Sequence, residues 1–102
     1  MSMLHIVNKS AYEKDSLKSC ISHAVSGASI LMIEDGIYSA IKNTSASSMV
    51  ESAMKDVSVY VLGPDLKARG ISEDKVIDGI SVVDYAGFVE LSTKNDVVQS
   101  WL

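Results

Sequence analysis

Residues 28–36 read ASILMIEDG, a mostly apolar run that stops at two carboxylates and a glycine. Continuous apolar runs are typical of strands that are buried on both faces of a parallel sheet. The sequence therefore predicts a central parallel strand over residues 28–33. Functional sites of such sheets lie beyond the carboxyl ends of the strands, which places Glu34 and Asp35 where a ligand or a reaction would be expected.

The rest of the chain alternates short apolar segments with amphipathic ones. Further strands are expected at residues 3–7 (MLHIV), 57–62 (VSVYVL) and 80–83. Residues 97–102 are expected to form a fifth strand or a docked extension. Helices are expected at residues 15–26, 37–41, 48–55, 64–69 and 85–94. Strands that alternate with helices form right-handed βαβ units, so the helices should cover both faces of the sheet. We therefore predict one α/β domain over residues 1–102, a three-layer α/β/α sandwich with a mainly parallel sheet of about five strands.

Polar residues and glycines mark the ends of the predicted helices. Asp15 and Asp84 stand where a side chain can accept hydrogen bonds from the first backbone N–H groups of a helix. Gly27 suits the left-handed backbone that often ends a helix. One face of the last helix is expected to carry Tyr85, Phe88, Val89 and Ser92.

The composition limits what the domain can bind. Of the 102 residues, 47% are hydrophobic and 22% are charged, and the formal net charge is -4. A protein that binds nucleic acid through its phosphates needs a clustered positive field, so direct nucleic-acid binding is not expected. The mean hydropathy of +0.20 is high for a domain with so large a surface-to-volume ratio. We therefore expect both a buried sheet and an apolar surface that other subunits cover.

The sequence shows no sign of export or of a membrane span. Residues 1–10 lack the apolar core of a signal peptide, and no apolar run reaches the roughly 18 residues that cross a bilayer. The single cysteine, Cys20, excludes an internal disulfide, and no zinc-ligand spacing is present. Dinucleotide-binding, phosphate-loop, esterase and zinc-protease motifs are absent too. We expect a soluble cytoplasmic protein without metal or cofactor.

Three carboxylates after the predicted strands, Glu34, Asp35 and Asp84, admit two interpretations. An acidic cluster beyond a buried strand is typical of a phosphoacceptor receiver domain, which would bind Mg²⁺ or a small anion. That fold also needs a lysine after its last strand, and none follows the strand that ends at Val83. The simpler interpretation is that Asp35 and Asp84 cap helices and bind their free N–H groups.

Cys20 is the only soft nucleophile, and the sequence leaves two roles open for it. A thiol that carries sulfur must ionise and stay accessible, and His23, three residues further along the helix, could favour the thiolate when it is protonated. Cys20 also belongs to the apolar stripe of its helix, with Leu17 and Ile21. Free cysteines are among the most buried residue types, which favours a structural role.

The end of the sequence is too apolar for a free tail. Trp101 is the only tryptophan, and tryptophans are typical anchors of protein–protein interfaces. Trp101, Leu102 and Val98 are therefore candidate interface residues, although Trp101 suits docking on its own domain equally well. The basic pair Lys67 and Arg69 is expected to interact with the negative end of its own short helix.

Taken together, five features occur in the order in which the DsrH/TusB family has them. They are MLHIVNKS at residues 3–10, ILMIEDGIYSAI at 30–41, YVLGPDLKARGI at 60–71, ISVVDYAGFVEL at 80–91, and a tryptophan near the end. The sequence resembles this family over nearly its whole length, which implies a DsrE/F/H-like fold. It is most similar to DsrH of sulfur-oxidising bacteria, because Cys20 in the first helix fits DsrH whereas TusB proteins can lack that cysteine.

The resemblance implies an accessory subunit of a cytoplasmic sulfur-relay complex. DsrH-like chains assemble with DsrE-like and DsrF-like subunits as a hexamer with two copies of each. The principal persulfide cysteine belongs to the DsrE subunit, and sulfur passes on to a DsrC/TusE-like carrier. The process expected from this likeness is intracellular sulfur oxidation.

Two alternatives to that role stay open. In the first, the chain is a TusB-type subunit of the complex for 2-thiolation of the wobble uridine in transfer RNA. In the second, the chain is itself a thiol sulfurtransferase in which Cys20 carries a persulfide and His23 modulates its reactivity.

Overall fold

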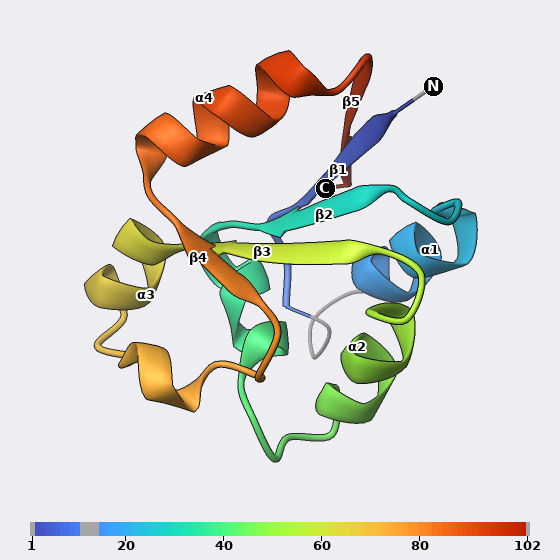
Figure 1. Cartoon of the computed structure of the whole chain (residues 1–102). Helices are drawn as coiled ribbons and strands as arrows, with labels where there is room; N and C mark the ends of the chain where they lie inside the picture. The colour runs from blue at the N-terminus through green and yellow to red at the C-terminus, as the bar shows by residue number, and fades with distance from the viewer. Residues whose placement is uncertain (1, 11–14, 102) are drawn as a thin grey trace.

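One five-stranded sheet organises the structure, which is a computed structural model that describes residues 2–10 and 15–101. All strands are parallel, and their order is β4-β3-β2-β1-β5 (Figure 1). The strands are β1 Met3–Val7, β2 Ser29–Met32, β3 Ser58–Leu62, β4 Ser81–Val83 and β5 Val97–Trp101. The predicted central strand, now β2, lies in the middle of the sheet.

The helices follow the predicted order but differ in their ends. The α-helices are α1 Ser16–His23, α2 Ser47–Ala53, α3 Gly63–Ala68 and α4 Tyr85–Lys94, and the 3-10 helices are η1 Glu34–Ala40 and η2 Glu73–Lys75. The helix predicted at residues 37–41 is thus the second half of a longer 3-10 helix. Among the described residues no helix is both long and apolar enough to cross a membrane.

The first helix is shorter than predicted. It was expected to reach residue 26, but Ala24 already has extended backbone angles, while its N–H still bonds to the carbonyl oxygen of Cys20. Gly27 has the expected left-handed backbone, with a φ of 90°, but it lies in the following loop. Asp15 stands at the cap position, and its side chain accepts no capping hydrogen bond.

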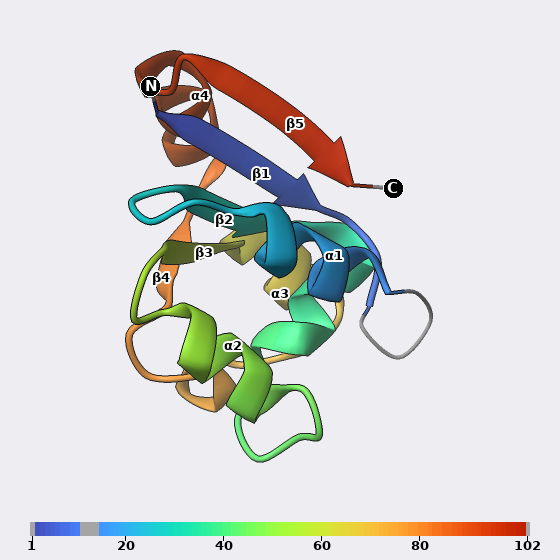
Figure 2. The same ribbon diagram turned by 90° about the vertical axis from the view of Figure 1, so that its right-hand side faces the viewer.

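The two faces of the sheet are covered unequally. Of the described helices, α1, α2, α3 and η1 pack on one face, whereas α4 lies by itself over the other (Figures 1 and 2). Successive strand residues point to opposite faces, so β1 contributes Val7 to the larger core and Leu4 and Ile6 to the smaller one. The resulting three layers confirm the predicted α/β/α sandwich, with a thin third layer.

The contacts of α4 correct one prediction. Its four expected face residues do not all turn inward: Phe88 packs against the smaller core together with Leu91, whereas Tyr85 is 62% and Val89 63% exposed. Each residue advances a helix by about 100°, so Val89 turns away once Phe88 faces the sheet. No residue of α4 is buried.

Candidate functional site

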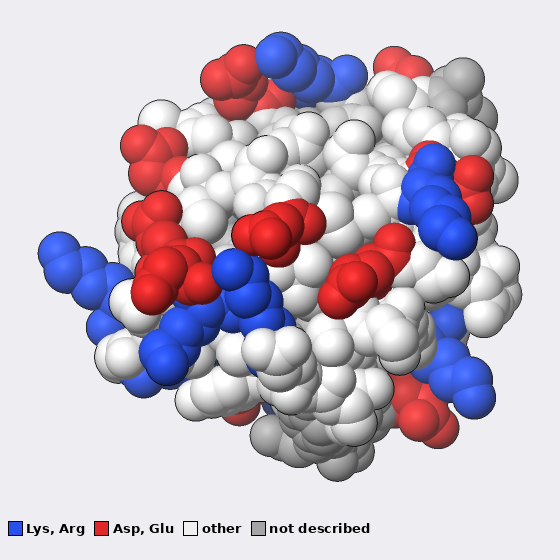
Figure 3. All heavy atoms as spheres, turned by 60° about the horizontal axis from the view of Figure 1, so that its bottom comes forward, with Lys and Arg blue, Asp and Glu red and all other residues white. Residues whose placement is uncertain are grey.

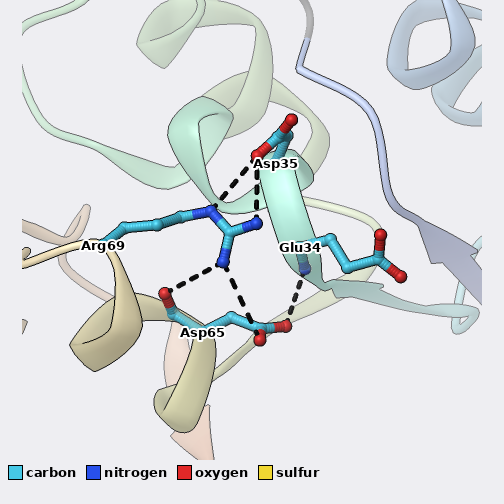
Figure 4. A network of polar contacts seen from close by, with 4 residues as sticks. All are labelled: Glu34, Asp35, Asp65 and Arg69. Carbon is cyan, nitrogen blue, oxygen red and sulfur yellow. Dashed lines mark hydrogen bonds and ion pairs between the residues drawn. The ribbon is translucent and has the colours of Figure 1, made fainter.

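A network of charged side chains joins the carboxyl ends of β2 and β3 (Figure 4). Arg69, directly after α3, donates from Nε and Nη2 to Oδ1 of Asp35, at 3.2 and 3.0 Å. Its Nη1 donates to the backbone carbonyl oxygen of Asp65 at 3.4 Å. Asp65 Oδ2 in turn accepts from the backbone N–H of Glu34 at 2.7 Å. These four residues, the carboxyl-edge network, tie η1 to α3.

Arg69 therefore does more than the sequence predicted for it. It contacts its own helix through the carbonyl oxygen of Asp65, as expected, but its two shorter bonds reach Asp35 in η1. The hydrogen bonds that Arg69 donates to Asp35 raise the pKa of Arg69 above its ordinary value. The side chains of Arg69 and Asp35 are 25% and 43% exposed, and such pairs stabilise a fold by only about 1 kcal/mol. The network orients the edge of the sheet more than it stabilises the domain.

Close backbone packing holds η1 at this edge. Glu34 has a φ of 50°, a left-handed conformation that few residues other than glycine adopt, and its N–H is fixed by Asp65. Gly36 passes so near the end of β1 that an added Cβ would lie 2.3 Å from the carbonyl oxygen of Val7. The Glu-Asp-Gly sequence after the central strand therefore combines a left-handed residue at Glu34 with a residue at Gly36 that must lack a Cβ.

Two of the carboxylates at this edge, those of Asp35 and Asp84, are engaged in structural contacts. Asp84 caps α4 as predicted, since its Oδ1 accepts from the backbone N–H of Gly87 at 2.8 Å. Asp35 was expected to cap a helix as well, but it lies within the first turn of η1 and binds Arg69 instead. The contacts of Asp35 and Asp84 thus account for the presence of both carboxylates, and the phosphoacceptor interpretation is not needed for them.

Two open cavities lie beside α3. The larger, of about 520 Å³, has Lys67 and Glu73 among its lining residues, and the smaller, of about 440 Å³, reaches Asp84. Gly63 and Pro64 line both. Acidic and basic side chains lie side by side on the face that carries α2 and α3 (Figure 3). The described residues of this face therefore form no extended surface of one charge.

Cys20 is completely buried on the inner side of α1. It belongs to the larger core together with Leu17, and burial raises the pKa of its thiol to about 12. His23 is exposed, and its Nδ1–H donates to the carbonyl oxygen of Ser19 at 2.8 Å. As folded, the thiol lacks both properties that sulfur transfer requires, ionisation and access.

We expect native Cys20 to react very slowly with iodoacetamide at about pH 8. With a pKa of about 12 in place of 9.0, the thiolate fraction is lower by roughly a thousandfold, and burial slows access further. Mass spectrometry after timed alkylation measures the rate, with urea-unfolded protein as the control that exposes the same thiol. Rapid modification of the native protein would contradict a purely structural role.

Trp101 contacts two histidines, His5 and His23. Its indole Nε1–H donates to Nδ1 of His5 at 3.0 Å, and its ring centroid lies 5.6 Å from that of His23. His5 is only 1% exposed, and burial, with a further contribution from the charge of His23, lowers its pKa. The sequence predicted no role for His5. The signal that would have marked it is a single polar residue in an otherwise apolar strand.

The candidate interface residues have different surroundings. Trp101 is half-buried and packs against the larger core of its own chain, so it anchors β5 on its own domain. Val98 is 44% exposed and its neighbour Val97 is 37% exposed. Leu102 lies outside the described residues. A role for Val98 and Leu102 in an interface stays a prediction.

Large apolar side chains are exposed mainly on α4 and β5. Of the six that the described part of the chain exposes, four belong to these two elements: Tyr85, Val89, Val97 and Val98. The sequence indicated an apolar surplus but assigned Tyr85 and Val89 to a common face with Phe88. Their exposure is a tertiary property, because it depends on which side of α4 meets the sheet.

Comparison with solved structures shows that this fold is shared. The crystal structure of the YchN protein from E. coli superposes with a TM-score of 0.79 at 18% identity, covering 98% of this chain and 99% of that one. The protein MTH1491 from Methanobacterium thermoautotrophicum, described as of unknown function, gives a TM-score of 0.76 at 16% identity, covering 97% and 96%. At these identities the likeness concerns the fold alone.

Sequence comparisons give the family. Protein TusB of Photorhabdus laumondii subsp. laumondii is 34% identical over 100 residues, covering 97% of this chain and 100% of the relative. Protein TusB of Buchnera aphidicola subsp. Baizongia pistaciae is 33% identical over 99 residues, with 97% and 100% covered. The model of the family described as DsrH like protein matches residues 9–98. The chain therefore belongs to the DsrH/TusB family, as its resemblance predicted.

Proposed function

We propose that the chain is an accessory subunit of a sulfur-relay complex, where it supplies interface surface and shapes the thiol site of a partner. Its family supports this role. The observation that carries it is the exposure of Tyr85 and Val89 on α4, the one helix in the described part of the chain that covers this face of the sheet. Exposed apolar side chains are unfavourable in water, so their burial would lower the free energy of a small domain. Contact with a partner subunit would bury them.

The proposed assembly is a hexamer with two copies each of this chain, a DsrE-like subunit and a DsrF-like subunit. It passes sulfur to a DsrC/TusE-like carrier. Curated relatives bear the name TusB, which favours a place in 2-thiolation of the transfer-RNA wobble uridine. Cys20 in the first helix favours the DsrH-type role in sulfur oxidation. The two branches share one architecture, so the structural proposal holds for both.

The accessory role fits Cys20 better than a carrier role does. A persulfide carrier must expose a thiolate to its donor and its acceptor, whereas burial keeps this thiol protonated at neutral pH. Incubation with a persulfide donor should leave the Cys20 peptide without the added mass of one sulfur atom. An adduct formed on this chain, alone or in the complex, would instead support the sulfurtransferase alternative.

Purification of the native complex tests the proposal directly. We expect this chain to bring down two related α/β subunits, and native mass spectrometry should show two copies of each of the three chains. Sulfur oxidation and transfer-RNA thiolation are then distinguished by deleting the gene and measuring stored sulfur and 2-thiouridine. A chain that stays monomeric at high concentration and binds no candidate subunit would contradict the proposal.

A further inference from the structure

The two ends of β5 are held in different ways. β5 is an edge strand that pairs only with β1, and each of its residues except Trp101 is exposed. At its first end, Asp96 accepts from the backbone N–H of Ser2 at 3.0 Å and donates its own N–H to Ser2 at 3.1 Å. At its last end, Trp101 is the side chain that reaches the core. The docking of that end therefore depends on what Trp101 contacts.

The hydrogen bond to Trp101 fixes the protonation of His5. An indole N–H can only donate, so Nδ1 of His5 must be the acceptor, and a neutral His5 then carries its proton on Nε2. Nε2 is buried and has no hydrogen-bond partner among residues 2–10 and 15–101. A second proton could bind only at Nδ1, where the new N–H would face the N–H of Trp101. Protonation of His5 and the bond to Trp101 are therefore mutually exclusive.

The described elements next to His5 offer no negative charge that would compensate a positive charge on its ring. The strands β2 and β5 on either side of β1 contain no titratable side chain. α1, which packs on the same face, contributes His23, the buried thiol of Cys20 and the exposed Lys18. The ring of His23 lies against that of Trp101, the residue that donates the hydrogen bond to His5. A positive charge on His23 repels a positive charge on His5. These three elements contain no Asp or Glu.

We propose that His5 is a proton-operated latch for the C-terminal end of the chain. When Nδ1 takes up a proton from solvent, Trp101 loses its hydrogen bond and the last residues of β5 separate from β1. The first end of β5 stays attached, because the bonds from Ser2 lower the pKa of Asp96 and keep its carboxylate ionised over the same pH range. Acid thus exposes the edge of β1 without unfolding the domain.

The direction of the pH dependence follows from burial. The pKa of His5 is lowered in the docked state and returns towards its ordinary value of 6.5 when the strand is released. The released state therefore binds the proton more readily, and docking is weakened as the pH falls from 6.5 towards the pKa of the docked state. For a single proton the opening equilibrium changes by about tenfold per pH unit in this window.

Fluorescence and hydrogen exchange of the full chain test the latch. Trp101 is the only tryptophan, so its emission reports this site alone. Between about pH 7.5 and about pH 5 we expect the emission maximum to move to longer wavelength. Over the same range the amide of Trp101 should exchange faster, after correction for the intrinsic rate, whereas that of Val97, which bonds to the carbonyl oxygen of Ser2, should stay protected. The measurement needs no partner subunit, so its outcome is independent of the proposed function.

Two variants distinguish the contribution of His5 to the pH transition from that of His23. His5→Gln retains an acceptor oxygen but cannot titrate, so its emission maximum should not move with pH. His23→Gln should keep the transition and shift its midpoint to higher pH, because a repelling charge is removed. A transition that persists in His5→Gln, or disappears in His23→Gln, overturns the proposal.

A label on the wild-type protein keeps the test decisive if His5→Gln does not fold. With ¹⁵N-labelled histidine, the ring nitrogens of His5 should titrate with the same midpoint as the Trp101 emission. Different midpoints, or a release of Val97 together with Trp101, would show that another group or general unfolding is responsible.

Discussion

Replacing Gly36 with alanine should destabilise the domain by about 3 kcal/mol, a large part of the total stability of a chain this size. The new Cβ would lie 2.3 Å from the carbonyl oxygen of Val7 and 3.0 Å from its carbonyl carbon. Both are backbone atoms of β1, so they cannot rotate away as a side chain could. Relief requires η1 to shift from the sheet, which also displaces Asp35 from Arg69. Urea unfolding followed by circular dichroism measures the loss.

Gly27→Ala is the matched control for this substitution. It adds the same methyl group where nothing lies within 4 Å, so its cost comes only from the backbone φ of 90°. That conformation costs a residue with a Cβ about 1–2 kcal/mol. The free energy of unfolding should therefore fall more for Gly36→Ala than for Gly27→Ala. Equal losses would show that η1 does not pack against β1 as described.

Replacing Val89 with aspartate should weaken assembly with the partner subunits by about a hundredfold, equivalent to about 2.7 kcal/mol. The proposed interface would bury the new carboxylate without a partner, and unpaired buried charges are strongly unfavourable. The isolated chain should keep its stability, because Val89 is 63% exposed and packs little within its own domain. Analytical ultracentrifugation of the purified subunits gives the dissociation constant.

Val25→Asp provides the same chemical change at an equally exposed valine. Val25 is 62% exposed and lies in the loop after α1. α1 packs on the face of the sheet opposite α4 (Figure 1). It should leave the dissociation constant within about twofold, as surface substitutions usually do. If both variants weaken assembly equally, net charge and not the surface of α4 controls association. If neither does, α4 is not part of the interface.

Local sequence signals were sufficient for the order and the type of most elements, although not for the end of α1 or the inward face of α4. The apolar run at residues 28–33 became the middle strand, and the tail at residues 97–102 became β5, apart from Leu102, which lies outside the described residues. Asp84 caps α4 as predicted, because a cap and the N–H groups it binds are at most three residues apart. Such features depend on neighbours in the chain, so they can be recognised without knowledge of the rest.

Other features depend on contacts between distant parts of the chain. Arg69 meets Asp35 across 34 positions, and Trp101 meets His5 across 96. No local pattern links these residues; parallel pairing of β5 with β1 brings the last pair together. The sequence indicated that Trp101 is buried in a contact, but it left open whether that contact lies within its own domain or with a partner subunit.

The sequence by itself thus determined the class of fold, the order of strands and helices, and the surplus of apolar side chains. Only the tertiary structure decided how that surplus is distributed: α4 packs through Phe88, so Val89 faces outward. It also decided that Cys20 is a buried thiol and that His5 is bound to Trp101. The physical reason is that burial and side-chain pairing are set by the packing of whole elements against one another, whereas the residues along each element specify only its periodicity and its ends.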